Sequence, residues 1–267
     1  MTDSFTHHSQ WPHALPQEVA VAIEVNGVSY AVMMASPFDL DDFAIGFLFT
    51  ERVIKSLIDV HDIELVCVDK GILVQVEVAN RCALSLKQKR RFLKGTSGCG
   101  LCGVVALEHA FEQLPRIVTS SRVFENGLPM DLKKRCSRQQ LQRKVKTGQD
   151  SEALHAAFWL NATGEISVCR EDIGRHNAVD KLIGSLIKQA GNVNFAQGAL
   201  VVTSRCSVEL VHKAIVTQIG TLISFASPST LAVALARTHN VQLIHVPKSD
   251  KPVLYASTHC VASEVSL

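Results

Sequence analysis

The chain has 267 residues, which is enough for one large domain or two modest domains with their own hydrophobic cores. Its 47% apolar and 19% charged residues exclude an intrinsically disordered chain and indicate a globular protein. The net charge of +2 is unevenly distributed, because residues 81–148 contain 15 Lys or Arg and only 4 Asp or Glu. This basic sector favours an anionic partner, such as a phosphorylated ligand, a nucleic acid or an acidic protein surface.

The N-terminal residues 1–17 are polar and rich in histidine, and they lack the basic-then-apolar pattern of a signal peptide. We expect them to form a flexible tail. Eight cysteines without a signal peptide predict reduced thiols and a cytoplasmic protein. The uncharged run 214–236 is long enough to span a bilayer, but it contains several polar residues. We therefore expect a buried helix, strand and helix there, and no membrane segment.

The first half of the chain predicts an α+β arrangement. Strands over 19–25 and 28–34 flank Asn26-Gly27, a strong signal for a hairpin turn. A helix is predicted from 36 to about 54, followed by a second hairpin of strands 63–68 and 72–78. Further helices are expected over 104–114 and 137–146.

The second half alternates strands and helices. Strands are predicted over 156–160, 165–170, 199–203, 222–225 and 241–246, and helices over 175–189, 207–219 and from 227 onward. The strands are unbroken apolar runs, which favours a sheet covered by helices on both faces. We predict three parts: the tail 1–17, an N-terminal α+β domain over 18–130 and an α/β domain over 131–267.

A glycine-rich stretch, GTSGCGLCG over 95–103, carries Cys99 and Cys102. Four glycines in nine residues oppose a helix or strand interior, so the two cysteines are predicted to lie on a loop. Thiolate is the reactive form of cysteine, and Cys-x-x-Cys spacing and nearby cations both lower a thiol pKa. A sulfur-transfer or redox site is our first interpretation. Half of a zinc site, a thioredoxin-type dithiol and a structural disulfide are the alternatives.

Three polar clusters follow predicted strands. The first contains Arg175, His176 and Asn177, the second contains Arg205, and the third is the sequence SPST at 227–230. In open α/β sheets, ligands bind at the carboxyl ends of strands, and helix N-termini favour anions. Arg175 can bind phosphate in a bidentate manner and His176 can transfer a proton. Helix capping explains each cluster alone, but three together predict a phosphate-binding pocket.

The motifs together resemble the FdhD family, the formate dehydrogenase accessory sulfurtransferases. The resemblance covers about 18–256 and rests on VNG, MMASPFDLDDFAIGFLFTE, SGCGLCG, EDIGRHNAVDKLIG, SRCSVELVHKA and SPSTLAVALA. It implies an N-terminal α+β domain followed by a cytidine-deaminase-like three-layer α/β/α domain, and a homodimer. It also implies that Cys99 carries a persulfide with Cys102 assisting. The sulfur would come from a cysteine desulfurase and pass to the molybdenum bis(molybdopterin guanine dinucleotide) cofactor, which then enters formate dehydrogenase.

The resemblance further places cofactor binding on a C-terminal stretch, which aligns with Val246, Pro247, Lys248, Ser249, Asp250 and Lys251. Lysines stand there where the family has arginines, so the charge is kept and the bidentate geometry is lost. Deaminase chemistry is not implied, because the sequence has no H-x-E motif. We expect no resident metal and no nucleic-acid partner. Two other functions remain open: a chaperone that only binds the cofactor, and a zinc-binding interaction module.

Overall fold

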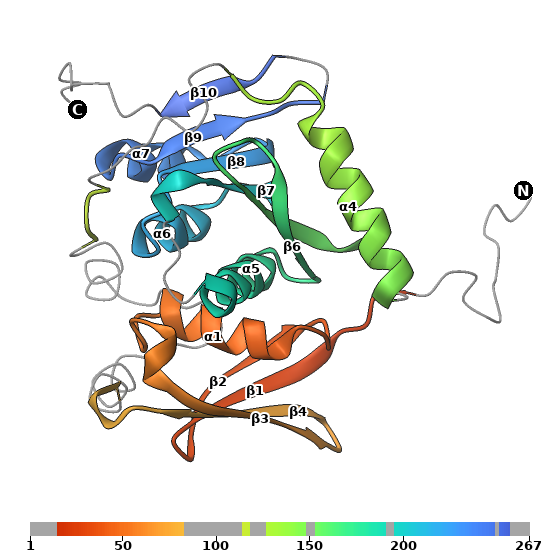
Figure 1. Cartoon of the computed structure of the whole chain (residues 1–267), viewed down its shortest axis with the longest axis vertical. Helices are drawn as coiled ribbons and strands as arrows, with labels where there is room; N and C mark the ends of the chain where they lie inside the picture. Colours follow the sequence, from red (N-terminus) through yellow and green to blue (C-terminus); the bar gives the residue numbers. More distant parts are fainter. Residues whose placement is uncertain are drawn as a thin grey trace, which may run out of the picture.

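The protein is described by a computed structural model that covers residues 15–82, 114–117, 127–147, 153–190, 195–248 and 251–256 (Figure 1). Within these ranges the chain forms a four-stranded sheet from the first half of the sequence and a six-stranded sheet from the second half. Five α-helices of at least nine residues accompany the two sheets in these ranges.

The four-stranded sheet has the order β2-β1-β4-β3. It is built from two antiparallel hairpins joined through a parallel pair, β1 with β4. Its strands are β1 (Val19–Val25), β2 (Val28–Ala35), β3 (Val60–Val68) and β4 (Gly71–Val78). The first turn has positive φ at both Asn26 (49°) and Gly27 (72°), as the hairpin prediction required.

Helix α1 (Leu40–Thr50) is shorter than the helix predicted over 36–54. Asp39 adopts a left-handed conformation (φ 55°) immediately before the helix, and Arg52 does the same two residues after it (φ 55°). An α-helix cannot continue through a left-handed residue. The prediction of both ends was therefore wrong, although the buried stripe of the helix, which includes Phe43 and Leu48, is as expected.

The six-stranded sheet has the order β10-β9-β8-β7-β5-β6. Strands β7, β8 and β9 are parallel, while β5 is antiparallel to both β7 and β6. Strands β6, β7, β8 and β9 therefore run in one direction, and their carboxyl ends share one edge of the sheet. The strands are β5 (His155–Leu160), β6 (Ile166–Asp172), β7 (Ala199–Arg205), β8 (Thr221–Ala226), β9 (Gln242–His245) and β10 (Val253–Ala256), the last of which we did not predict.

Helices cover both faces of the six-stranded sheet. Helices α5 (Arg175–Ala190), α6 (Val208–Val216) and α7 (Thr230–Thr238) share one apolar core with alternate strand residues such as Trp159 and Leu200. Helix α4 (Leu132–Thr147) packs on the opposite face against the intervening residues, among them Phe158. The predicted three-layer α/β/α arrangement is confirmed. Helix α4 is longer than the predicted 137–146, because it begins soon after Pro129.

Helix α1 joins the two sheets. One face of α1 packs on β1 and β4, and the other packs on α5, so that a single apolar core runs from the small sheet to the large one (Figure 1). The two helices touch at glycines: a Cβ on Gly46 would lie 1.8 Å from the Asp180 carbonyl oxygen, and one on Gly184 would lie 1.9 Å from that of Asp42. Only residues without a side chain allow the backbones to approach so closely.

Other predictions fall outside the described residues or are not tested by the structure. The helix predicted over 104–114 and the tail 1–17 lie almost wholly outside, and the boundary between the predicted domains at 130–131 stays a prediction. Within the described ranges, no helix combines the length and apolar character needed to cross a bilayer.

Candidate functional site

The three predicted polar clusters meet at the carboxyl edge of the six-stranded sheet. His176, in the first turn of α5, places its Nε2 3.4 Å from the Oγ of Ser207, which precedes α6. The Ser229 amide, at the start of α7, donates to the Cys206 carbonyl at 3.1 Å. The starts of α5, α6 and α7 are thus linked in a row, as the parallel strand ends required.

Arg175 opens α5 at this edge and is half-buried. Its Nε is buried and has no hydrogen-bond partner among the residues that the structure describes. Ser224, two residues before the end of β8, has a buried Oγ that likewise has no hydrogen-bond partner among the described residues. Buried polar atoms almost always have partners, so these two atoms, without one among the described residues, mark a place that a polar ligand could fill.

Two histidines lie beside Arg175 and respond to its charge. Burial lowers the pKa of His176 below its usual value, and the neighbouring Arg175 guanidinium lowers it further. Burial and Arg175 also lower the pKa of His155, at the start of β5. Both effects disfavour the imidazolium. Near neutral pH the edge therefore carries the fixed charge of Arg175 next to neutral imidazoles, one of which lies 3.7 Å from the Glu209 carboxylate.

Asn177, the third residue of the first cluster, is turned toward the protein interior. Its Nδ2 donates to the Met34 carbonyl at 2.9 Å and to Asp172 Oδ1 at 3.0 Å. Both donors of this amide are therefore used by the chain itself. Asn177 connects β2 with the turn that follows β6, and its contact with a cofactor stays a prediction.

Asp172, the last residue of β6, holds this turn in place and has no exposed surface. It forms an ion pair with Lys181 (2.6 Å) and accepts hydrogen bonds from the amides of Ser36 (3.0 Å) and Gly174 (2.8 Å). Lys181 also donates to the Ser36 carbonyl at 3.0 Å. These contacts fix the loop that follows β2 against the turn that presents Arg175.

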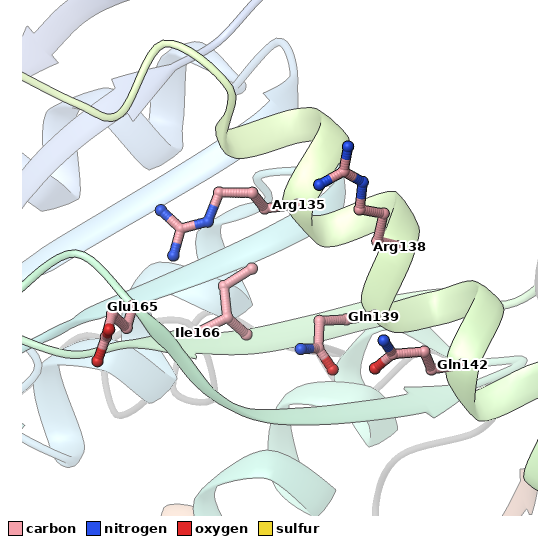
Figure 2. A pocket seen from close by; sticks show the side chains of 6 residues that line it. All are labelled: Arg135, Arg138, Gln139, Gln142, Glu165 and Ile166. Carbon is pink, nitrogen blue, oxygen red and sulfur yellow. The ribbon is translucent and has the colours of Figure 1, made fainter.

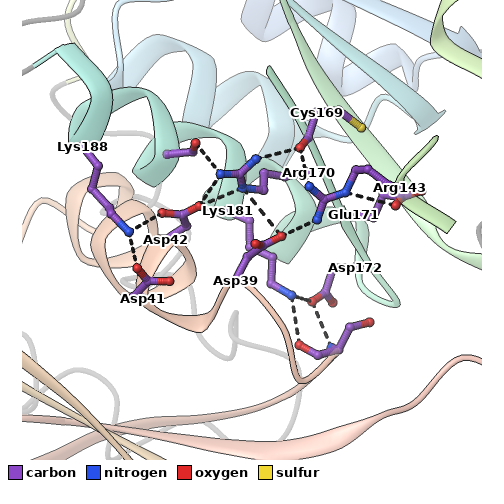
Figure 3. A network of polar contacts seen from close by, with 12 residues as sticks. Asp39, Asp41, Asp42, Arg143, Cys169, Arg170, Glu171, Asp172, Lys181 and Lys188 are labelled. Atoms are coloured by element: carbon purple, nitrogen blue, oxygen red, sulfur yellow. Dashed lines mark hydrogen bonds and ion pairs between the residues drawn. The ribbon is translucent and has the colours of Figure 1, made fainter. Parts of the chain in front are cut away.

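A wider polar network continues from Asp172 toward α4 (Figure 3). Arg170 pairs with Asp42 at 2.7 Å, and Arg143 of α4 pairs with Asp39 at 2.5 Å and with Glu171 at 3.3 Å. The network thereby ties the start of α1 to β6 and to the end of α4. Burial raises the pKa of Glu171, whose carboxylate nevertheless accepts from Arg143 and Gln140.

At the other end of the edge, beyond β9, a hollow of about 410 Å³ opens between α4 and the β9–β10 connection. Its lining includes Val246, Pro247 and Lys248 from the predicted cofactor-binding stretch, and Lys133 and Lys134 from α4. Burial lowers the pKa of Lys133, and the like charge of Lys248 lowers it further. An anion placed between these ammonium groups would relieve their repulsion.

The remaining predicted cofactor residues are placed as follows. Arg205 is exposed at the end of β7, between Arg175 and Lys248 in strand order. Lys251 is exposed at the start of the segment that leads into β10, and Ser249 and Asp250 lie outside the described residues. Four strand spacings separate β6 from β9, about 19 Å. The predicted residues thus lie along one edge and do not form one compact pocket.

Cys99 and Cys102 lie outside the described residues, and their role stays a prediction. The described cysteines are mostly buried: burial raises the pKa of Cys136, Cys169 and Cys206 to about 12. Such thiols stay protonated near neutral pH and are poor nucleophiles. Cys67 is the exposed cysteine of the described ranges, on edge strand β3.

Across the described ranges, no three His, Cys, Asp or Glu side chains are grouped so that they could hold a metal ion. Sequence reasoning missed two residues of the edge, Lys133 and His155. Lys133 belongs to a basic helix without a distinctive motif, and His155 stands alone before an apolar strand. Neither offered a signal beyond its residue type, because the sheet order brings them to the edge.

Comparisons with known proteins show the family of this chain. The chain belongs to the FdhD/NarQ family, whose family model matches residues 16–262. Among curated proteins, it is 40% identical over 256 residues to the sulfur carrier protein FdhD of Cupriavidus necator, covering 96% of this chain and 86% of that protein.

Two further comparisons agree with this assignment. The chain is 38% identical over 242 residues to the sulfur carrier protein FdhD of Shewanella oneidensis, covering 89% of this chain and 82% of that protein. It also resembles the crystal structure of a putative formate dehydrogenase accessory protein from Desulfotalea psychrophila. That match has a TM-score of 0.64 and 24% identity, and it covers 92% of this chain and 89% of that one. The predicted family and fold class are thereby confirmed.

Proposed function

We propose that this protein is a sulfur carrier that delivers persulfide sulfur to a molybdenum cofactor required by formate dehydrogenase. Its membership of the FdhD/NarQ family, with relatives named sulfur carrier proteins, is the main support. The cationic carboxyl edge of the sheet carries the proposal within the structure, because it offers a place for a ligand with phosphate groups. The donor is a cysteine desulfurase, the acceptor is formate dehydrogenase, and the protein acts as a homodimer in the cytoplasm.

The sulfur step uses Cys99, with Cys102 assisting. The Cys99 thiolate attacks the terminal sulfur of the donor's persulfide, a new S–S bond forms on Cys99, and the donor's S–S bond breaks to release its thiolate. The buried thiols of Cys136, Cys169 and Cys206 are unsuited to this attack, since their pKa lies far above neutral pH. Among the other cysteines, the Cys-x-x-Cys spacing and the nearby cations in the sequence favour Cys99 and Cys102 as the carriers.

The edge of the sheet holds the cofactor in this proposal. Arg175 has a buried Nε that has no partner in the described part of the chain and fits a phosphate oxygen, and Arg205 and Lys248 add positive charge along the same edge. Guanidinium–phosphate contacts are charge-assisted and can be bidentate. The pyrophosphate groups of a guanine dinucleotide are therefore well matched to this row. When bound, the cofactor supplies the molybdenum that accepts the sulfur.

The first experiment separates sulfur chemistry from cofactor binding. The protein is incubated with a cysteine desulfurase and cysteine, and a gain of about 32 Da, the mass of one sulfur atom, is expected on Cys99. Cys99→Ala abolishes the adduct and leaves guanosine diphosphate binding unchanged, while Cys67→Ala keeps both. An adduct confined to Cys67 would refute the assignment.

The second experiment removes a proposed cofactor contact and leaves the sulfur-carrying cysteines intact. Arg175→Ala should still load persulfide, but its affinity for guanosine diphosphate should fall roughly tenfold to a hundredfold, as a lost charge-assisted contact of about 1.5–3 kcal/mol predicts. If Arg175→Ala keeps its affinity for guanosine diphosphate but loses persulfide loading, Arg175 serves the interface with the sulfur donor and not cofactor binding. Persulfide loading of the protein would argue against the chaperone alternative. A purified protein without stoichiometric zinc would argue against the zinc-module alternative.

A further inference from the structure

Helix α4 presents a basic surface that the proposed sulfur and cofactor chemistry does not use. Its 16 residues include seven Lys or Arg and no Asp or Glu. Four polar side chains lie at spacings of three, four and seven residues, which places them on one stripe of the helix. These side chains are Arg135, Arg138, Gln139 and Gln142. Together with Glu165 and Ile166 of the β5–β6 hairpin, they line a hollow of about 340 Å³, which we call the α4 groove (Figure 2).

The hydrogen-bond donors of the α4 groove are unused within the described part of the chain. None of the four α4 side chains has a hydrogen bond or ion pair there, although Arg135 and Gln139 are half-buried. The contrast with Arg143, on the same helix, is clear, since its guanidinium binds Asp39, Glu171 and the Cys169 carbonyl. Guanidinium groups offer five donors in a planar fork that matches a carboxylate. The α4 groove is therefore complementary to a partner that supplies carboxylates.

The rest of the surface favours a protein over a nucleic acid. Leu141 lies beside Arg138 on the helix surface and is 60% exposed, and Ile166 lies between the polar groups of the α4 groove. The lining contains no aromatic side chain on which a base could stack. Carboxylates with an apolar neighbour suit this pattern better.

The position of α4 indicates which protein binds. Lys133 and Lys134, one turn before Arg138, line the hollow beside the Val246–Lys248 stretch. A protein that lies along α4 would therefore meet the place where the proposed cofactor is held. We propose that the α4 groove docks an acidic, partly apolar segment of the protein that receives the cofactor. The role of the partner rests on the proposed function.

Binding to a defined probe tests the docking itself. The probe is a fluorescein-labelled 12-residue peptide of Glu, Asp and Leu, and its binding to the full chain is measured by fluorescence anisotropy. The charge-reversal variant Arg135→Glu/Arg138→Glu should weaken binding at least about tenfold, or about 1.4 kcal/mol. The control Lys55→Glu/Lys70→Glu makes the same change of net charge on exposed residues of the other half of the molecule and should alter affinity less than about threefold.

Equal weakening by the two variants would overturn the proposal, because binding would then follow net charge alone. The proposal would also be overturned if a 12-nucleotide oligothymidylate bound more tightly than the peptide and only Arg135→Glu/Arg138→Glu abolished that binding. The surface would then be assigned to nucleic acid. The role of the partner is tested separately in cells that depend on this protein for formate dehydrogenase activity. Arg135→Glu/Arg138→Glu should lower that activity while persulfide loading of Cys99 stays normal. Lost loading would assign the surface to the sulfur donor instead.

Discussion

Replacing Lys181 by Met tests the structural importance of the buried ion pair beneath the candidate site. The Lys181 ammonium group has no exposed surface and lies 2.6 Å from Asp172 Oδ2, 3.0 Å from the Ser36 carbonyl and 4.6 Å from the centre of the Phe38 ring. Methionine keeps most of the aliphatic stem but removes the charge. The variant therefore leaves the Asp172 carboxylate buried without its counter-ion.

The expected loss is large. Removing one partner of a buried ion pair typically costs about 3–5 kcal/mol, because the remaining charge is uncompensated. For a domain of about 150–250 residues each kcal/mol corresponds to about 2–4 °C in Tm, so Tm should fall by about 6–20 °C. The Asp172 carboxylate still accepts from Ser36, Gly174 and Asn177, which places the loss toward the lower part of this range.

The matched control is Lys188→Met on the same helix. Lys188 pairs with Asp41 and Asp42, but its side chain is 37% exposed, and ion pairs of exposed residues contribute about 0–1 kcal/mol. Thermal and urea unfolding of both variants provide the comparison. If Lys181→Met lowers stability no more than Lys188→Met does, the buried pair does not hold the turn and the reasoning is wrong.

Two further predictions concern packing and titration. Gly184→Ala should destabilise the protein by about 1–3 kcal/mol in urea unfolding, because its Cβ would clash with the Asp42 carbonyl, whereas Gln189→Ala on the exposed side of the same helix should stay within about 0.5 kcal/mol. Arg175→Ala should raise the pKa of His176 toward 6.5 in an NMR titration, and Arg175→Lys should not, since it keeps the charge. In the wild-type protein the His176 contribution to stability is fully present above pH 6.5 and is lost as the pH falls toward the lowered pKa, because the unfolded state binds the proton first. A His176 pKa that is equal in all three proteins would show that the Arg175 charge does not reach the imidazole.

Much of the fold could be predicted from local patterns. The hairpin at Asn26-Gly27 and the alternation of apolar strands with helices follow from backbone sterics and side-chain periodicity, which are local properties. The ends of α1 could not be predicted, since they depend on left-handed backbone at Arg52 and at Asp39, whose carboxylate pairs with Arg143 of the distant helix α4. The contact of α1 with α5 through Gly46 and Gly184 depends on packing between distant segments, which periodicity does not encode.

The candidate site was predictable in part for a similar reason. The rule that ligands bind at strand carboxyl ends predicted that Arg175, Arg205 and the SPST sequence at 227–230 would share an edge, and the strand directions place them there. The sequence did not reveal which polar side chains point outward, because that depends on the neighbours that three-dimensional packing brings. Lys133 and His155 reach the edge only through the position of α4 and the order of the strands.

The dense polar stretch around β6 and the start of α5 has two separate origins. Glu171, Asp172, Asn177 and Lys181 are buried and bind α4, β2 and the loop after β2, so their polarity belongs to an interface between layers. Arg175 is different, since its Nε has no partner among the described residues. Polar density alone therefore does not identify a ligand site; unused hydrogen-bonding capacity does. By that criterion, Arg175 remains the candidate for ligand binding, and Asn177 belongs to the structure that holds Arg175 in place.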